Sequence, residues 1–218
     1  NATFGPKDVR AGHVAIVTQS GAIGIAMVGK TKVENIGLSA IISCGNKADI
    51  DEADLLDYLA NHAETKIIMM YVEGVRDGER LVAKLKQVTQ KKPVIVIKSG
   101  RSKRGAMAAA SHTGSLAGAD GVFDSVVRQA GVIRAESLQE GLDWCKFLAN
   151  SAPPGGTQAV IITNGGGIGV LGTDACEKYE VSMFDDQAAL EEAFAGACPS
   201  FGSCKNPVDI TGGATAED

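Results

Sequence analysis

The feature of this sequence that most constrains its fold is a series of four short, continuous apolar runs. Each run is rich in Val, Ile or Met and does not alternate strictly between apolar and polar residues. Uninterrupted runs of this kind are typical of strands in a parallel sheet that is covered on both faces. The four predicted strands lie at residues 13–18, 38–43, 66–72 and 93–98.

Amphipathic stretches of helical length follow and separate these runs. With 27 glycines and only 5% aromatic residues, the chain also has a composition that suits many tight strand-to-helix turns. Alternation of strands and helices predicts an α/β fold with a doubly wound parallel sheet. The predicted helices lie at residues 23–34, 52–62, 78–90, 119–130 and 137–150.

A Pro- and Gly-rich linker at residues 151–156 interrupts this pattern, which then restarts. We predict one domain over residues 1–152 and the start of a second, incomplete domain over residues 157–218. The chain begins with Asn1 rather than Met, so we expect it to be a piece of a larger polypeptide. The restart comprises a strand, a glycine turn, a helix, a short strand and a helix at residues 158–163, 164–167, 169–179, 181–184 and 187–195.

Composition argues against several classes of protein. A net charge of −5 is unlike the basic surface of a nucleic-acid binder. No apolar run reaches the roughly 20 residues of a membrane span, and no secretory signal is present. The five cysteines are scattered without a CxxC pair, so we expect neither a metal site nor disulfides, but reduced thiols in the cytoplasm.

Two segments share one pattern: an apolar strand, Thr, an amide residue, a turn of small residues, Ile-Gly and a helix. They are VTQSGAIG and TNGGGIG. A helix that begins at such a turn offers unpaired backbone N–H groups and a positive dipole end, and glycine lets an anion approach closely. We predict two phosphate-binding turns: a first turn of Gln19, Ser20, Gly21 and Ala22, and a second turn of Asn164, Gly165, Gly166 and Gly167.

The second turn also permits a different interpretation. Gly167, Gly169 and Gly172 satisfy the GxGxxG pattern, and Asp185 or Asp186 follows at about the distance of a ribose-binding acid. Nicotinamide binding is therefore an alternative. It has little further support, because nothing else in the chain resembles a site for hydride transfer.

Residues 99–118, here called the histidine segment, lie between a predicted strand and a predicted helix. The segment is rich in Gly, Ala, Ser and basic residues, and we expect a long functional loop. It contains His112, whose imidazole could attack an acyl phosphate and pass the phosphoryl group on. A surface histidine with ordinary hydrogen bonds is the alternative. The neighbours of His112 in this loop are Ser111, Thr113 and Gly114.

A nucleophilic histidine needs a partner that holds its second ring nitrogen, and a carboxylate usually fills that role. Glu73 directly follows the run at residues 66–72, at the carboxyl end of a predicted strand. The first turn lies at the same edge of a parallel sheet. We therefore predict that Glu73 is the partner of His112, with a solvated acid at a strand end as the alternative.

Five segments together resemble the nucleoside-diphosphate-forming acyl-CoA synthetases, a superfamily that includes ADP-forming acetate–CoA ligase and succinyl-CoA ligase. They are VTQSGAIG, YVEG, KSGRS…SHTGSLAG, TNGGGIGV and NPVDITGGA, and they cover nearly the whole chain. The resemblance implies two flavodoxin-like ligase domains. It also implies that His112 is phosphorylated, that Glu73 steadies it, and that both turns grip the phosphoryl group.

The resemblance further implies an ADP-forming acyl-CoA ligase that works through an acyl phosphate and a phosphohistidine carried on a mobile loop. CoA and ADP or ATP with Mg²⁺ would be bound mainly by a CoA-binding domain and an ATP-grasp domain or subunit of the same ligase. We expect a small carboxylate or acyl-CoA substrate and an oligomer. The alternative is a ligase-like sensing module of a protein acyltransferase. Asp209 could line the second turn or only cap a turn of its own.

Overall fold

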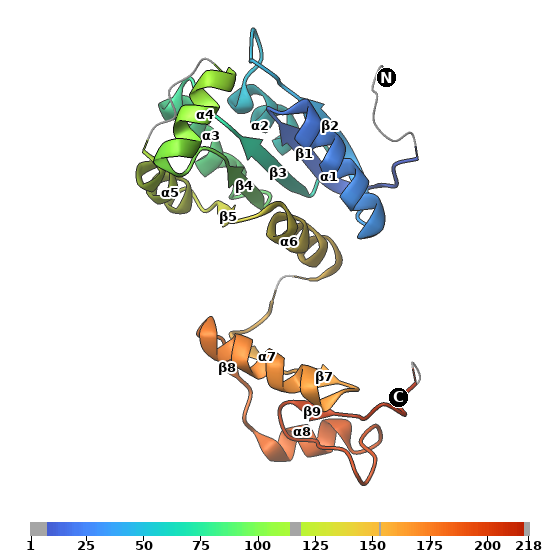
Figure 1. Ribbon diagram of the computed structural model, residues 1–218. Coiled ribbons are helices and arrows are strands. Elements are labelled where there is room, and N and C mark those ends of the chain that lie inside the picture. The colour runs from blue at the N-terminus through green and yellow to red at the C-terminus, as the bar shows by residue number, and fades with distance from the viewer. Residues whose placement is uncertain (1–7, 114–118, 153, 216–218) are drawn as a thin grey trace. The chain divides into compact units, whose positions relative to one another are not determined.

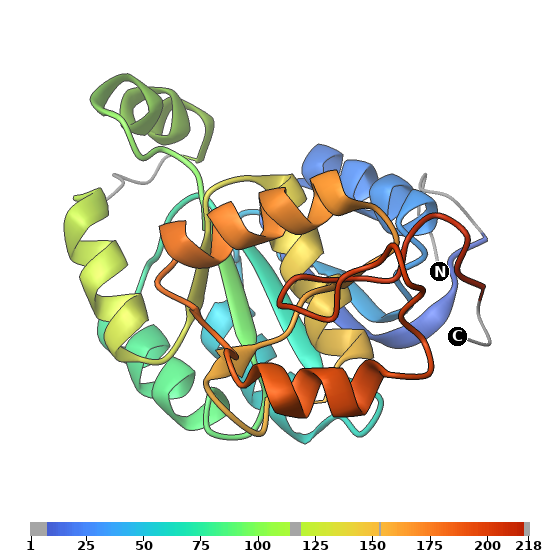
Figure 2. The ribbon, with the colours of Figure 1, turned by 90° about the horizontal axis from the view of Figure 1, so that it is seen from below.

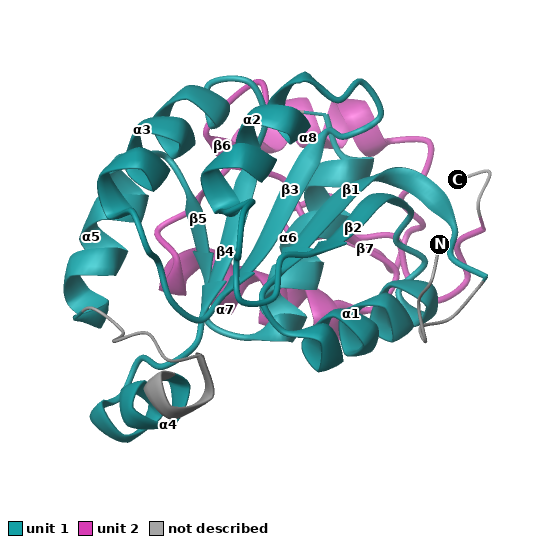
Figure 3. Cartoon of the chain, turned by 90° about the horizontal axis from the view of Figure 1, so that it is seen from above, with its two compact units in different colours: residues 1–152 teal, residues 153–218 magenta. Residues whose placement is uncertain are grey.

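The computed structural model describes residues 8–113, 119–152 and 154–215. They fall into two compact units, Asn1–Ala152 and Pro153–Asp218 (Figure 3). Each unit is described by itself below. Among the helices of the described ranges, none combines the length and apolar character that crossing a membrane requires.

The first unit contains a five-stranded parallel sheet in the order β2-β1-β3-β4-β5, which is the flavodoxin-like strand order (Figure 1). The predicted α/β fold with a doubly wound sheet is therefore confirmed. The three-residue strand β5 was not predicted, because so short a run carries little periodicity. The strands are β1 (Ala11–Thr18), β2 (Leu38–Ser43), β3 (Ile67–Val72), β4 (Val94–Lys98) and β5 (Ile133–Ala135).

Helices cover both faces of this sheet. Side chains of α2, α3 and α5 form one core cluster with the sheet, and side chains of α1 and α6 form the other. Alternate residues of the strands supply the two clusters, as Ala15 and Val17 do on one face and Val14 and Ile16 on the other. The helices are α1 (Gly21–Val33), α2 (Glu52–Asn61), α3 (Gly78–Val88), α5 (Asp120–Gln129) and α6 (Leu138–Asn150).

The histidine segment differs from its prediction. Residues Lys103–Thr113 form helix α4, so the expectation of an unbroken loop over residues 99–118 is wrong. The run Ala-Met-Ala-Ala-Ala has strong helix propensity, and Ser102 Oγ accepts a hydrogen bond from Gly105 N at 3.0 Å at the start of the helix. Figures 2 and 3 show α4 projecting away from the sheet and from the helices that cover it.

The second unit has two short parallel strand pairs, β6 with β8 and β7 with β9. The predicted strand at residues 158–163 is thus divided into β6 and β7, which pair with different partners. Helix α7 begins at Gly166, three residues before the predicted start. The elements are β6 (Gln158–Ala159), β7 (Ile162–Thr163), α7 (Gly166–Lys178), β8 (Ser182–Met183), α8 (Gln187–Phe194) and β9 (Val208–Asp209).

Candidate functional site

The first turn joins β1 to α1 and is locked by its own residues. Thr18 Oγ1 donates to Ser20 O at 2.8 Å and accepts from Ser20 N at 3.1 Å. Ser20 then caps the helix, because its Oγ accepts from Ile23 N at 3.3 Å. A Cβ on Gly24 would lie 2.8 Å from Thr18 Cγ2, so this position has no room for a side chain. The turn therefore holds the exposed start of α1 in a fixed geometry.

The second turn repeats these contacts at the same spacing. Thr163 Oγ1 donates to Gly165 O and accepts from Gly165 N, both at 3.0 Å. A Cβ on Gly169 would lie 3.3 Å from Thr163 Cγ2 and 3.0 Å from Pro207 Cβ. The repeat read from the sequence is thus confirmed as a repeat of structure. Asn164 and Gly165 precede α7, with Gly165 at its N-cap, and Gly166 and Gly167 lie in the first turn of the helix.

Asp209 has both of the roles considered for it. Its Oδ1 accepts from Thr211 N at 2.9 Å and so caps a local turn. Its Oδ2 lies 3.0 Å from the position of a Cβ on Gly166, at the beginning of α7. A cavity of about 310 Å³ adjoins this point, lined by Thr163, Gly166, Val170, Thr173, Asp174, Pro207 and Asp209.

The nicotinamide alternative is wrong. Gly167, Gly169 and Gly172 all lie inside α7, whereas the fingerprint places its first glycine in the turn before the helix. Asp186 accepts from Ala189 N at 3.1 Å and caps α8, so it is already engaged in a local role.

Gln19 points into the first unit rather than toward the start of α1. Its Oε1 accepts from Glu73 N at 2.8 Å and from Gly74 N at 3.0 Å. Its Nε2 donates to Gly74 O at 2.9 Å and to the carboxylate of Glu52. These contacts give the amide a structural role, and the prediction of phosphate binding is carried forward for Ser20, Gly21 and Ala22 without Gln19.

Glu73 lies just beyond β3, next to the first turn. Because β1 and β3 pair in parallel with Thr18 opposite Tyr71, their carboxyl ends share one edge of the sheet. Glu73 is only 7% exposed, so the alternative of a solvated acid at a strand end is wrong. The position agrees with the predicted edge, whereas the role of Glu73 toward His112 stays a prediction.

Two buried lysines that sequence reasoning missed complete this edge. Lys98, at the end of β4, donates from Nζ to Glu73 O at 2.7 Å and to the carbonyl oxygen of Ser99. Lys47 donates from Nζ to Glu52 Oε1 at 2.7 Å and to Gly74 O at 2.6 Å. Burial lowers the pKa of Lys98. Lys98 ends β4, and Lys47 lies in the segment between β2 and α2. A lysine at either kind of position normally faces solvent, so only the long-range contacts reveal that these two are buried.

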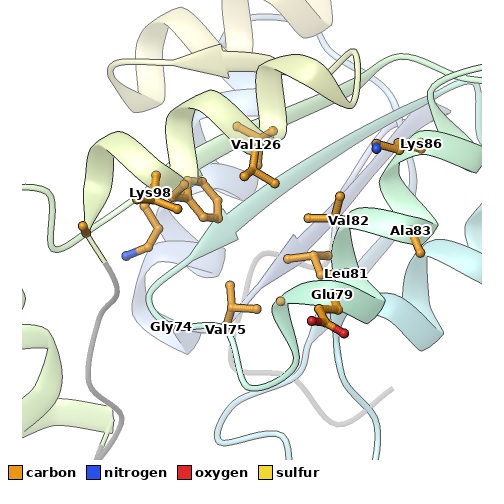
Figure 4. Close-up of a pocket in the computed structure, with 14 residues that line it drawn as sticks. Gly74, Val75, Glu79, Leu81, Val82, Ala83, Lys86, Lys98 and Val126 are labelled. Atoms are coloured by element: carbon orange, nitrogen blue, oxygen red, sulfur yellow. The ribbon is translucent and has the colours of Figure 1, made fainter.

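An apolar groove of about 740 Å³ lies between α3 and α5 and reaches this edge. Gly74 and Lys98 both belong to its lining, and Figure 4 shows Lys98 and Lys86 toward opposite ends of it. Lys98 Nζ lies 5.9 Å from the ring centroid of Phe123, which also lines the groove. Lys98 thus contacts both the polar network and the apolar groove.

His112 lies near the end of α4, together with Ser111 and Thr113. Gly114 lies outside the described residues. The segment leaves the sheet at the end of β4, where Ser99 N donates to Val72 O at 3.0 Å. Its first residue therefore lies beside Glu73, on the same edge as the first turn.

Comparison with known proteins agrees with this architecture. Residues 11–148 match the family model of the succinyl-CoA ligase like flavodoxin domain, and residues 159–217 match that of the ligase-CoA domain. The chain is similar to the ADP-forming acetate–CoA ligase I subunit alpha of Pyrococcus furiosus, with 55% identity over 97% of this chain and 46% of that protein. It is 41% identical to the ADP-forming 4-hydroxybutyrate–CoA ligase of Nitrosopumilus maritimus, over 98% of this chain and 31% of the relative.

A solved structure gives the same result. The dinucleotide-forming acetyl-coenzyme A synthetase 1 of Ca. Korarchaeum cryptofilum, in complex with phosphate and ADP, matches with a TM-score of 0.90 and 45% identity, over 98% of this chain and 47% of that one. The chain spans half or less of the length of these relatives. The strand order, the family match over residues 11–148 and these likenesses lead to one conclusion: this chain belongs to the succinyl-CoA ligase-like flavodoxin domain family.

Proposed function

We propose that this chain is the phosphohistidine-carrying part of an ADP-forming acyl-CoA ligase. One observation carries the proposal: the first turn, the buried Glu73 and the root of the histidine segment meet at one edge of the sheet. A phosphate-binding turn, a carboxylate and a histidine are the groups that relay of a phosphoryl group requires. The likeness to ADP-forming acetate–CoA ligases supports acetate as the acyl group.

The proposed reaction has three reversible steps. A phosphate oxygen attacks the thioester carbon of acyl-CoA, the carbon–sulfur bond breaks, and acyl phosphate and CoA result. A ring nitrogen of His112 then attacks phosphorus, and the carboxylate leaves. Finally, an oxygen of the ADP β-phosphate attacks phosphorus, the nitrogen–phosphorus bond breaks, and ATP forms.

The residues of this chain would act by positioning and by charge stabilisation, as is usual in phosphoryl transfer. Backbone N–H groups of Ser20, Gly21 and Ala22 would hold the phosphoryl oxygens, and those of the second turn would bind phosphate in the same manner. Glu73 would accept a hydrogen bond from the second ring nitrogen of His112. Its carboxylate would thereby stabilise the cation that phosphorylation creates.

CoA, ADP and ATP belong in this proposal to a CoA-binding domain and an ATP-grasp domain or subunit of the same ligase. Relatives at least twice as long as this chain support additional parts of that kind. In the described part of the chain, no cluster of three or more His, Cys, Asp or Glu could hold a metal ion, so we assign Mg²⁺ to the nucleotide. We also propose that the ligase is an oligomer and that it lies in the cytoplasm. The five unbridged cysteines fit a reducing compartment.

The decisive experiment is phosphorylation of the full-length protein with ATP that carries ³²P at the γ phosphate, in the presence of Mg²⁺. We expect label that is labile in acid and stable in base, and we expect His112→Asn to abolish it. Label that persists in this variant would contradict the proposal. Nucleotide or acyl-CoA binding without any label would instead favour the sensing module.

A further inference from the structure

Each of the four backbone N–H and C=O groups of Glu73 and Gly74 forms a hydrogen bond with a side chain. Gln19 accepts from both N–H groups. Lys98 donates to Glu73 O, and Lys47 and Gln19 donate to Gly74 O. The Cα–Cβ direction of Glu73 is therefore fixed by groups that reach it from β4, from the first turn and from the segment before α2.

Lys98 differs from the other two because it also contacts the histidine segment. One ammonium group donates to Glu73 O at 2.7 Å and to the carbonyl of Ser99, the first residue of that segment. Lys98 is only 6% exposed, so these bonds are shielded from competing water. Gly100 follows with φ of +71°, a left-handed conformation in which the chain turns away from the strand.

We propose that Lys98 is a positioning residue of the phosphoryl transfer, whose buried ammonium sets the root of the histidine segment relative to Glu73. The inference rests on the proposed function, in which Glu73 steadies His112. Lys98 touches the carbonyl oxygens of Glu73 and Ser99 and acts through them. Without the ammonium, the Glu73 carbonyl would lose its donor, and the turn could shift by the fraction of an ångström that misaligns a carboxylate with an imidazole.

The chain offers a matched control at the opposite end of the same strand. Lys92, which precedes β4, donates from Nζ to Leu59 O at 2.7 Å and to His62 O at 2.8 Å. Burial lowers the pKa of Lys92 as it does that of Lys98. Both lysines therefore join two carbonyls with a partly desolvated ammonium, but only Lys98 adjoins Glu73.

The test compares Lys98→Met and Lys92→Met in the full-length protein, with the single-turnover rate of phosphohistidine formation and the nucleotide KM as readouts. We expect Lys98→Met to slow phosphorylation by about 10- to 100-fold without changing the KM, and Lys92→Met to leave the rate unchanged. Thermal unfolding is recorded for each variant. If Lys98→Met does not fold, Lys98→Gln, which keeps a polar end, replaces it.

A double-mutant cycle with Glu73→Gln separates positioning from general stability. If Lys98 acts through Glu73, Lys98→Met has no further effect in the Glu73→Gln background. Equal slowing in both backgrounds, equal slowing by Lys92→Met, or a normal rate in Lys98→Met would each overturn the inference. Failure of the proposed function would look different, because label would then persist in His112→Asn whatever residue occupies position 98.

Discussion

The buried lysines near Glu73 donate hydrogen bonds to backbone carbonyl groups, and one of them, Lys47, also forms an ion pair. Lys47 pairs with Glu52, and Gln19 bonds the same carboxylate. Burying such groups is costly unless each has partners, and these partners include the carbonyls of Glu73 and Gly74. At the scale of single residues, the consequence is a turn whose geometry is fixed before any ligand arrives.

This organisation leads to a prediction for Glu73→Gln. The amide keeps the size of the side chain but removes the charge that would stabilise a phosphorylated imidazole, so we expect about 10- to 100-fold slower phosphorylation with little change in thermal stability. Rapid-quench labelling measures the rate, and Glu79→Gln on the exposed surface of α3 serves as the control. A wild-type rate in Glu73→Gln would remove this acid from the mechanism.

Residue-level prediction succeeded where the relevant contacts are local and failed where they are distant. The turn at Ser20 and Gly21 was predicted because Thr18 and Gly24 lie within a few positions of it. Lys98 was missed because its two acceptors become neighbours only when β3 and β4 pair. Gln19 was placed at the right edge of the sheet but among the phosphate-binding residues, since nothing in the sequence indicates which way a side chain points at a strand end.

At the scale of elements, each turn depends on close packing of a helix against the threonine that ends the preceding strand. In α1, Gly24 lies against Thr18, whereas a Cβ on Gly29 of the same helix would meet nothing within 4 Å. The two glycines therefore differ in their effect on stability. Gly24 is required because a larger residue would collide with Thr18, whereas Gly29 only lowers the helix propensity of α1 relative to alanine.

We therefore expect opposite effects from two alanine substitutions in α1. Gly24→Ala forces a contact of 2.8 Å with Thr18 Cγ2, and we expect it to lower the free energy of unfolding by about 1–3 kcal/mol and to weaken phosphorylation. Gly29→Ala should raise that free energy by about 0.5–1 kcal/mol. Chemical denaturation measures both, and a stabilising Gly24→Ala would show that the turn is not packed as described.

Helix α4 marks the limit of prediction for elements. The basic and small residues at positions 99–118 indicated a loop, and the alanine run within them forms a helix instead. The alanine run has a high intrinsic helix propensity, which the reading of this segment as a loop did not weigh, and the helix that it forms projects from the sheet. The strands β1 to β4, in contrast, were predicted well, since burial on both faces leaves a continuous apolar run.

At the scale of the whole molecule, the first unit has a complete core of its own. Both apolar clusters draw their side chains from residues 14–149, so the two faces of the sheet are covered from within this unit. We propose that the domain boundary lies near Ala152 and Pro153, between the two compact units. A core that is complete within one segment does not depend on the following one for its stability.

Residues 1–152, expressed alone, should fold and unfold in one cooperative transition with flavodoxin-like α/β circular dichroism. Thermal melts of this segment and of the whole chain test the boundary. As a control, a segment ending at residue 135 lacks α6, which supplies Leu142 and Cys145 to the core, and should not unfold cooperatively. A non-cooperative melt of residues 1–152 would move the boundary.

The recurrence of one turn in both units has a consequence for how such a chain can be built. Thr18 and Thr163 each close a loop on the residue two positions later, and each rests its methyl group against a glycine six positions later. The contacts that shape each proposed phosphate-binding turn thus lie within seven consecutive residues. Because these contacts are local, the same turn can form at a second strand–helix junction. The amide residue that follows the threonine is then free to differ in orientation: Gln19 is directed inward, and Asn164 is exposed.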